Sequence, residues 1–325
     1  MNPDSETSAT EDILDPSSRL LQVLNDQRLA DIDECVAEQG TKVWINKNVD
    51  PKQLVNPVVD FEDVESITCL TFASLVNDFR TVRQLVEAGS DVRATDWTGS
   101  TPLHYACASR VEAQAKVEYM LQRDASLVNA TNYSENAVLD SKDDETLPCR
   151  LLLGVGETLP RYSTPLHVAT EHNQTECIKT LVNDGQSPVN ATDGDGWTTL
   201  RLASVFGNAE AAEVLVQRPD CRVNATDRWG RSGLHLAAEN GHTEAVKVLA
   251  EHPNCRVNAT DSDGSTALHT AAWAGHAEAV KVLVSHPRCD VSIIDMWGDT
   301  AAVEARREGH DDIAALIEAK SKGKR

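Results

Sequence analysis

Histidines and cysteines recur in this chain at regular spacings, as they would in a metal site or a row of catalytic groups. Four of the histidines follow a leucine in a shared short pattern: His104, His167, His235 and His269. Three of the cysteines recur every 34 residues: Cys221, Cys255 and Cys289. Zinc holds its sulfur ligands at about 2.3 Å, whereas helical units stack roughly 8–10 Å apart. Neighbouring units therefore cannot share an ion, and we expect these cysteines to fill small apolar spaces.

Other sequence patterns give no support for catalysis. The chain contains no G-x-S-x-G, Walker A or H-E-x-x-H motif, and Gly154-x-Gly156 lacks the third glycine of a phosphate-binding loop. There is no C-x-x-C pair, and the 8 cysteines occur without a secretory signal pattern, which favours free thiols. The sequence therefore predicts that the protein is not an enzyme, and it predicts no metal, no cofactor and no small-molecule substrate.

A repeat positions these residues, because one short pattern recurs in register along most of the chain. Its reference position holds leucine, or alanine once: Leu70, Leu103, Leu166, Leu200, Leu234, Leu268 and Ala302. A hydroxyl residue suited to a helix N-cap lies two residues earlier each time: Thr68, Thr101, Thr164, Thr198, Ser232, Thr266 and Thr300. Two short helices cannot bury their own apolar face, so such units must stack on one another.

Residues 261–295 show one complete unit. Thr266 is the expected N-cap of a helix over Ala267–Ala274, and Gly275 can adopt the left-handed conformation that ends this helix. A second helix is expected over His276–Ser285, with its valines and leucine on one apolar face. An extended segment should then lead into the turn of the next unit.

The turn between the two helices should need a residue with positive φ. The matching positions in the other units hold glycine or asparagine: Asn77, Asn173, Gly207, Gly241 and Gly309. Arg110 breaks the pattern, and the second helix of its unit is expected to be about half a turn longer. We therefore expect that turn to be rebuilt.

The residues around the reference leucines match a known signature. Thr101–Ala106 (TPLHYA) and Thr164–Ala169 (TPLHVA) have the T-P-L-H-x-A pattern, so the chain resembles the ankyrin-repeat family over roughly residues 67–319. The resemblance implies an all-α solenoid of stacked helix pairs with β-hairpin fingers. It also implies that the four histidines form structural hydrogen bonds between units. Members of the family bind other macromolecules, mostly proteins.

Net charge limits the class of partner. The chain carries 30 Lys and Arg against 51 Asp and Glu, a formal net charge of −21. Such a surface repels phosphate backbones, so we expect no nucleic-acid binding and a basic protein partner instead. There is no signal-peptide pattern and no apolar run near about 18 residues. This predicts no membrane contact and a cytoplasmic protein, with the nucleus as a second location.

Composition and repeat register divide the chain into four parts. Residues 1–18 are acidic and rich in Ser and Thr, and are expected to be a disordered tail. Residues 19–66 begin with a helical pattern and become irregular, which suits a degenerate repeat that caps the stack. The ankyrin-repeat domain is expected over residues 67–319, with an insertion at 133–162. Residues 320–325 are basic, either a solvated helix end or a weak nuclear signal.

Aromatic residues mark the expected binding surface. In ankyrin repeats the finger tips and inner helices are the target-contacting positions, and the resemblance carries this role to Trp97, Tyr105, Trp197, Val205, Phe206, Trp229, Trp273 and Trp297. Exposed aromatic side chains on one face are typical of an interface hot spot. The alternative is that each indole lies flat over the next finger and only stabilises the stack.

We interpret the chain as an adaptor that binds a protein segment, basic with apolar anchors, across the finger tips and concave face. The alternative is a regulatory inhibitor that masks a basic segment of a transcription factor or kinase. An inhibitor must displace another ligand of its partner, whereas an adaptor need not. A separate hypothesis follows from the resemblance. Val-Asn-Ala fingers can be substrates of an asparagine hydroxylase, and Asn129, eight residues after Leu121, has the best-fitting spacing.

Overall fold

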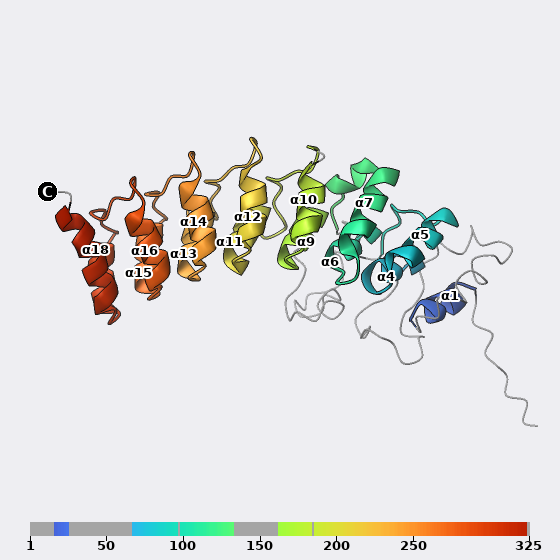
Figure 1. The fold of residues 1–325 in the computed structure, drawn as a ribbon, viewed down its shortest axis with the longest axis horizontal. Helices are drawn as coiled ribbons and strands as arrows, with labels where there is room; N and C mark the ends of the chain where they lie inside the picture. The colour runs from blue at the N-terminus through green and yellow to red at the C-terminus, as the bar shows by residue number, and fades with distance from the viewer. Residues whose placement is uncertain (1–15, 26–66, 97, 133–161, 184, 324–325) are drawn as a thin grey trace, which may run out of the picture. The chain divides into compact units, whose positions relative to one another are not determined.

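Helices dominate the part of the chain that the structure describes. The computed structural model describes residues 16–25, 67–96, 98–132, 162–183 and 185–323 (Figure 1). These residues form two compact units, with the division inside helix α7, between Tyr119 and Met120. The observed helix pairs confirm the all-α solenoid that the repeat predicts. None of the helices in these ranges is long and apolar enough to cross a membrane.

The first unit is built around helix α4. Its helices are α1 (Pro16–Asn25), α4 (Cys69–Val76), α5 (Phe79–Glu87), α6 (Pro102–Ala108) and the beginning of α7 (Ala113–Arg123). Helix α4 packs against α1, α5 and α6. The side-chain amide of Asn77 donates to the carbonyl of Leu24 at 3.1 Å, which ties the end of α4 to α1.

Three details of the first unit differ from, or complete, the sequence expectations. Helix α1 begins at Pro16, inside the expected disordered tail, because proline is well suited to the first turn of a helix. Asn77 has φ −93° where positive φ was predicted; its side chain instead stabilises an extended cap through Leu24. The turn at Arg110 is rebuilt as expected, with φ 46° at Glu112, and α7 spans 11 residues.

The second unit is a row of helix pairs. It contains the short 3-10 helix η2 (Ala125–Asn129) and the helices α9 (Pro165–Glu171), α10 (Thr175–Asn183), α11 (Thr199–Phe206), α12 (Ala209–Val216), α13 (Gly233–Glu239), α14 (Thr243–Glu251), α15 (Ala267–Trp273), α16 (Ala277–Ser285), α17 (Ala301–Arg307) and α18 (Asp311–Gly323). The odd-numbered helices pack on one another in sequence and form an inner layer, and the even-numbered helices from α10 to α18 form a second layer (Figure 1).

Hairpin fingers link successive pairs of the second unit. Each finger is closed by one isolated antiparallel bridge: Thr192 with Thr198, Thr226 with Ser232, Thr260 with Thr266, and Ile294 with Thr300. The bridge places the N-cap residue of the inner helix opposite the end of the preceding extended segment. This arrangement fixes where the finger tip lies relative to the helix that follows.

The turns inside the pairs confirm the prediction of positive φ in this unit. The relevant residues are Asn173, Gly207, Gly241, Gly275 and Gly309, with φ between 52° and 87°. At Gly207 a Cβ atom would also come within 2.5 Å of the ring of His242. That ring donates from Nε2 to the carbonyl of Val205 at 2.7 Å, so glycine permits a hydrogen bond between units.

The C-terminal boundary differs from the sequence expectation. Helix α18 continues to Gly323, so the basic segment expected from residue 320 is largely helical. The ammonium group of Lys320 donates to the carbonyls of Val284 and His286. These carbonyls lie at the C-terminal end of α16, where a cation is stabilised by the helix dipole. Lys320 therefore belongs to the last repeat and is not part of a free tail.

Candidate protein-binding groove

The repeated histidines cap helices and link neighbouring units. In each of the four, Nδ1 accepts a hydrogen bond, at 3.2 Å or less, from the backbone N–H of the N-cap residue three positions earlier. The four are His104, His167, His235 and His269. The Nε2 atom of His167 donates to the carbonyl of Trp197 at 3.2 Å, in the next finger. Burial lowers the pKa of His167 to about 4, which keeps the ring neutral. The corresponding Nε2 bonds of His235 and His269 reach Ser265 and Asp299, so the role between units that the resemblance implies is confirmed for these three histidines.

The cysteines spaced by 34 residues lie behind the fingers. Cys255 and Cys289 are buried and Cys221 is half-buried. Burial raises the pKa of the Cys221 and Cys255 thiols to about 11. Because the thiolate is the nucleophile, a raised pKa makes these thiols poor reactants at neutral pH. Their positions agree with the space-filling role expected from the sequence.

Aspartates at the start of each finger turn determine which side chains reach the tip. Asp295 shows the arrangement: its Oδ1 accepts from the backbone N–H groups of Trp297 and Asp299, both at 2.9 Å. Asp227 holds Trp229 in the same way, at 3.0 Å. This side-chain turn fixes the backbone of the tip, and in these two fingers the residue two positions after the aspartate projects outward. It explains why an indole at that position is exposed.

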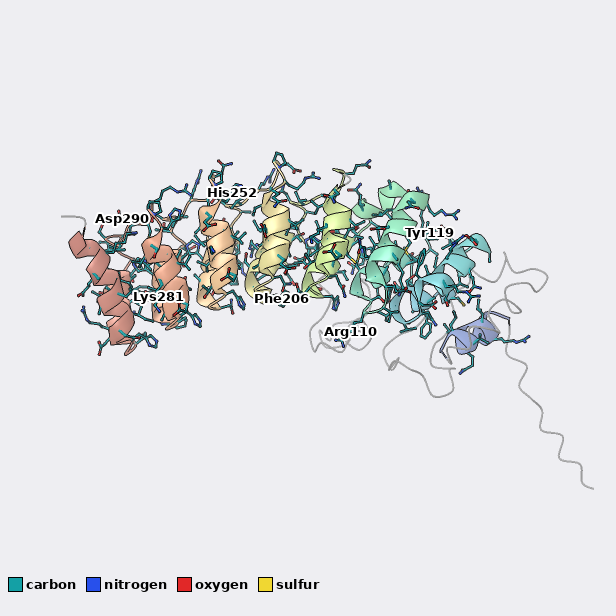
Figure 2. All side chains as sticks on the ribbon, in the orientation of Figure 1. Arg110, Tyr119, Phe206, His252, Lys281 and Asp290 are labelled. Carbon is teal, nitrogen blue, oxygen red and sulfur yellow. The ribbon has the colours of Figure 1, made fainter. Side chains whose placement is uncertain are left out.

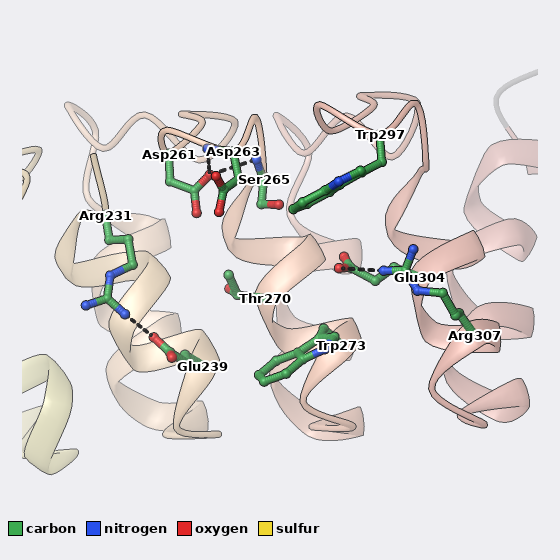
Figure 3. A pocket seen from close by; sticks show the side chains of 10 residues that line it. All are labelled: Arg231, Glu239, Asp261, Asp263, Ser265, Thr270, Trp273, Trp297, Glu304 and Arg307. Atoms are coloured by element: carbon green, nitrogen blue, oxygen red, sulfur yellow. Dashed lines mark hydrogen bonds and ion pairs between the residues drawn. The ribbon is translucent and has the colours of Figure 1, made fainter. Parts of the chain in front are cut away.

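A groove of about 480 Å³ opens on the inner side of α13, α15 and α17 (Figure 3). Its lining comes from three successive repeats and the finger that precedes each: Arg231, Glu239, Asp261, Asp263, Ser265, Thr270, Trp273, Trp297, Glu304 and Arg307. Trp297 reaches into the groove from the finger side and Trp273 from the end of α15, and the carboxyl group of Glu304 lies at a level between them. Both indoles keep much of their surface exposed, 50% for Trp273 and 62% for Trp297.

Charged side chains in the groove are mostly acidic. The lining contains four carboxyl groups and two guanidinium groups. Arg231 is engaged on both sides, with Glu239 at 3.0 Å and Asp227 at 3.0 Å. Arg307 contacts Asp299 at 2.8 Å. Both guanidinium groups are therefore already paired with carboxyl groups, and the groove as a whole favours a positively charged ligand.

Glu304 is the most unusual of these groups. Only 7% of its surface is exposed, and its Oε2 atom has no hydrogen-bond partner within the described ranges. Its Oε1 atom lies 3.5 Å from the guanidinium of Arg307. Burial, together with the nearby charge of Asp295, raises the pKa of Glu304 to about 7. A carboxyl group this close to neutrality can gain or lose its proton at physiological pH.

The sequence-predicted binding residues fall into three environments. Trp273 and Trp297 line the groove. Trp229 is exposed and its ring lies 4.0 Å from the guanidinium carbon of Arg228, while the half-buried Trp197 lies 4.3 Å from that of Arg201. Phe206 is exposed at the end of α11 (Figure 2), and Val205 beside it is half-buried. Trp97 lies outside the described residues.

Tyr105 is not available for binding. Only 6% of its surface is exposed, because its ring packs inside the first unit and its hydroxyl donates to Asp96 Oδ2 at 2.5 Å. The prediction that Tyr105 lies in a binding groove is therefore corrected. Asn129, proposed for hydroxylation, is exposed and is the last residue of the 3-10 helix η2. Its counterparts Asn190 and Asn224 instead donate from their side chains to the next finger.

Sequence reasoning missed several residues at the C-terminal end of the second unit. Ile294 and Met296 are exposed on the same finger as Trp297, and Val303 is exposed on α17. Glu304 was also missed, although the repeat register contained a signal. The equivalent position in the other units holds less polar residues: Phe72, Tyr105, Val168, Leu202, Leu236 and Thr270. A carboxyl group at a position that is otherwise apolar or weakly polar is an outlier worth testing.

Comparison with known protein families identifies the family of this chain. Residues 98–133 match the ankyrin repeat, and residues 137–227 and 219–295 match ankyrin repeats in arrays of three copies. The chain therefore belongs to the ankyrin-repeat family. Its repeats are protein–protein interaction modules, and proteins built from them are typically not enzymes. No curated protein shows significant similarity to the chain.

Proposed function

We propose that this chain is a non-enzymatic scaffold that binds a protein segment in the groove along α13, α15 and α17. The observation that carries the proposal is the pair of exposed indoles, Trp273 and Trp297, facing one acidic groove (Figure 3). The bound segment combines apolar anchors with basic side chains.

Apolar anchoring is supported by the concentration of exposed hydrophobic side chains near the groove. Ile294, Met296 and Trp297 follow one another closely on a single finger, and Met296 has 65% of its surface exposed. Tryptophan is enriched among residues whose truncation costs most binding free energy. Burying side chains of this size stabilises a complex by about 1.5–3 kcal/mol each before the entropy of association is subtracted.

Recognition of basic side chains is supported by charge. Asp261 and Asp263 sit at one finger and Glu304 at the next inner helix, all lining the same groove. Acidic and apolar surfaces in one groove discriminate against acidic partners, because a like charge placed there would be repelled. A segment with alternating basic and aliphatic residues matches both properties.

A displayed library of random peptides tests the proposal directly. Selection on the full chain should enrich sequences with Lys or Arg beside large apolar residues. The enriched peptides should bind the variant carrying Trp273→Ala and Trp297→Ala at least about tenfold more weakly, the expected loss for more than 1.4 kcal/mol. Titration calorimetry of one enriched peptide gives the affinities.

Phe206→Ala is the matched control, because Phe206 is an exposed aromatic of the same unit that lies outside the groove lining. This variant should keep full affinity. Equal loss in both variants would move the binding surface away from the groove. Enrichment of acidic or purely apolar peptides would overturn the proposed chemistry of the partner.

A further inference from the structure

Glu304 sits where the repeat stack does not need a carboxyl group. Its position on α17 corresponds to Leu202 and Leu236 in earlier units, which are buried apolar side chains. Burying a carboxyl group without a full set of partners costs free energy. Glu304 nevertheless keeps Oε2 unpartnered among the described residues. The apolar packing seen at this register position in earlier repeats therefore does not account for a carboxyl group here.

The carboxyl groups around Glu304 outnumber the cationic groups that could pair with them. The guanidinium of Arg307 lies 2.8 Å from Asp299, 3.5 Å from Glu304 and 3.6 Å from Glu308. One cation is thus shared by three carboxyl groups. Asp295, in the adjoining finger, also keeps Oδ2 without a partner in the described part of the chain. Two buried acceptor atoms remain for a second cation.

We infer that the carboxyl group of Glu304 receives a lysine or arginine side chain of the bound segment, between the indoles of Trp273 and Trp297. The inference rests on the proposed function and names the residue that selects the basic side chain. The aliphatic part of such a side chain can pack against the exposed indoles, which also attract cations over their faces. Its charged end reaches a carboxyl group at the groove wall (Figure 3).

Binding through Glu304 is linked to release of a proton. The pKa of Glu304 in the free protein is raised to about 7, so roughly half of the molecules carry the proton at that pH. A bound cation favours the ionised carboxyl group, so affinity increases as pH rises. Between about pH 6 and pH 8 the affinity should rise about tenfold if the pKa in the complex lies well below 6.

Several other charged groups lie near Glu304. The fingers contribute Asp295 and Asp299, α17 contributes Arg307, and Glu308 is the C-cap residue of α17. From α15, His269 donates to the carbonyl of Asp299, and burial lowers the pKa of its ring. From α18, Glu318 is paired with Arg306 at 2.6 Å. The lowered pKa of His269 favours its neutral ring.

The indole N–H signals of Trp273 and Trp297 in the full chain report on this site by NMR. The probes are the Nα-acetyl methylamides of lysine and arginine, with that of norleucine as the neutral counterpart. The cationic probes should shift both signals, with an apparent affinity about tenfold higher at pH 8 than at pH 6. Norleucine should shift them less and without dependence on pH. Equal shifts with norleucine, or none with either cationic probe, would overturn the inference.

Glu304→Gln and Glu308→Gln form a matched pair, because each removes one carboxylate, from α17 or from its C-cap, but only Glu304 is buried in the groove lining. The Glu304 variant should lose the response to the cationic probes and its pH dependence, while the Glu308 variant should keep both. Unchanged pH dependence in the Glu304 variant sinks the inference. If peptides still bind and still need Trp273 and Trp297, the proposed function survives that result; if they do not, both proposals fail.

Discussion

The fingers that begin at Asp96 and at Asp295 differ in how the second carboxylate oxygen of the aspartate is satisfied. They are the first and the last fingers that are followed by a described inner helix. Asp96 and Asp295 occupy the same repeat position, and each uses Oδ1 to accept from two backbone N–H groups of its turn. Nine residues later stands Tyr105 in one unit and Glu304 in the other. The Tyr105 hydroxyl donates to Asp96 Oδ2, whereas Asp295 Oδ2 has no partner in the described ranges.

This difference separates what the stack needs from what a ligand needs. A phenol at this position fills space, donates to the buried aspartate and closes the site. A carboxyl group there cannot donate when ionised, repels the aspartate and leaves acceptors available. The same register position is therefore structural at Tyr105 and open at Glu304, beside two exposed indoles.

The largest expected change in the free energy of unfolding comes from removing the Tyr105 hydroxyl. Tyr105→Phe leaves Asp96 Oδ2 buried without its donor. Hydrogen bonds to charged groups contribute about 1.5–3 kcal/mol, so unfolding free energy should fall by a similar amount. Urea unfolding measures the change. A double-mutant cycle with Asp96→Asn should show coupling, and additive losses would mean that the bond does not stabilise the unit.

A smaller effect of opposite sign is expected at the open site. Burial raises the pKa of Glu304 from 4.5 to about 7, so protonation of this carboxyl group stabilises the folded protein relative to the unfolded chain. This stabilisation is fully present below about pH 4.5 and is lost as pH rises through 7. Glu304→Gln should therefore be more stable than the native chain by about 1–2 kcal/mol at pH 8.

Urea unfolding near pH 5.5, 7 and 8.5 checks this sign. The advantage of the Gln variant should shrink as pH falls, because the native carboxyl group is then neutral as well. Glu308→Gln serves as the control, since Glu308 is exposed at the C-cap of the same helix. A stability difference that does not vary with pH, or a less stable Gln variant, would show that Glu304 is satisfied in the folded protein.

The smallest effect concerns the indoles. Trp297→Ala should change the unfolding free energy by no more than about 0.5 kcal/mol, because the ring is largely exposed. Trp197→Ala should cost at least about 0.5–1 kcal/mol, since that ring is half-buried against Arg201. Thermal melts of the two variants compare them. A large loss at Trp297 would support the alternative in which finger indoles only stabilise the stack.

Much of the fold was predictable because the repeat is local and periodic. The N-cap hydroxyls, the histidines and the glycines with positive φ each act within one turn or between adjacent units. The exceptions arise where the residue that makes a contact differs in type or position from the one in other repeats. Asn77 adopts an extended cap through Leu24, and Lys320 joins α18 to α16. Lys320 donates to the carbonyls of Val284 and His286, and one repeat earlier Arg288 donates to the corresponding carbonyls of Ala250 and His252.

The candidate site was predictable only in part. Aspartate-led turns place Trp229 and Trp297 at finger tips, and the sequence pattern was sufficient to expect their exposure. The aromatic residue type alone did not distinguish Trp273 from Tyr105, both on inner helices. A tyrosine ring can be buried where its hydroxyl finds an acceptor, and only the fold brings Asp96 to the Tyr105 hydroxyl.

By itself, the sequence determined the class of architecture and the register of the units, because these follow from short-range periodic contacts. The resemblance to the ankyrin-repeat family implied the structural role of the repeated histidines. Only the tertiary structure decided that Tyr105 is closed off, that Trp273 and Trp297 face one groove, and that Glu304 lies in it with an acceptor atom that has no partner among the described residues. The physical reason is that burial and pKa depend on side chains from several units at once. No single repeat contains that information.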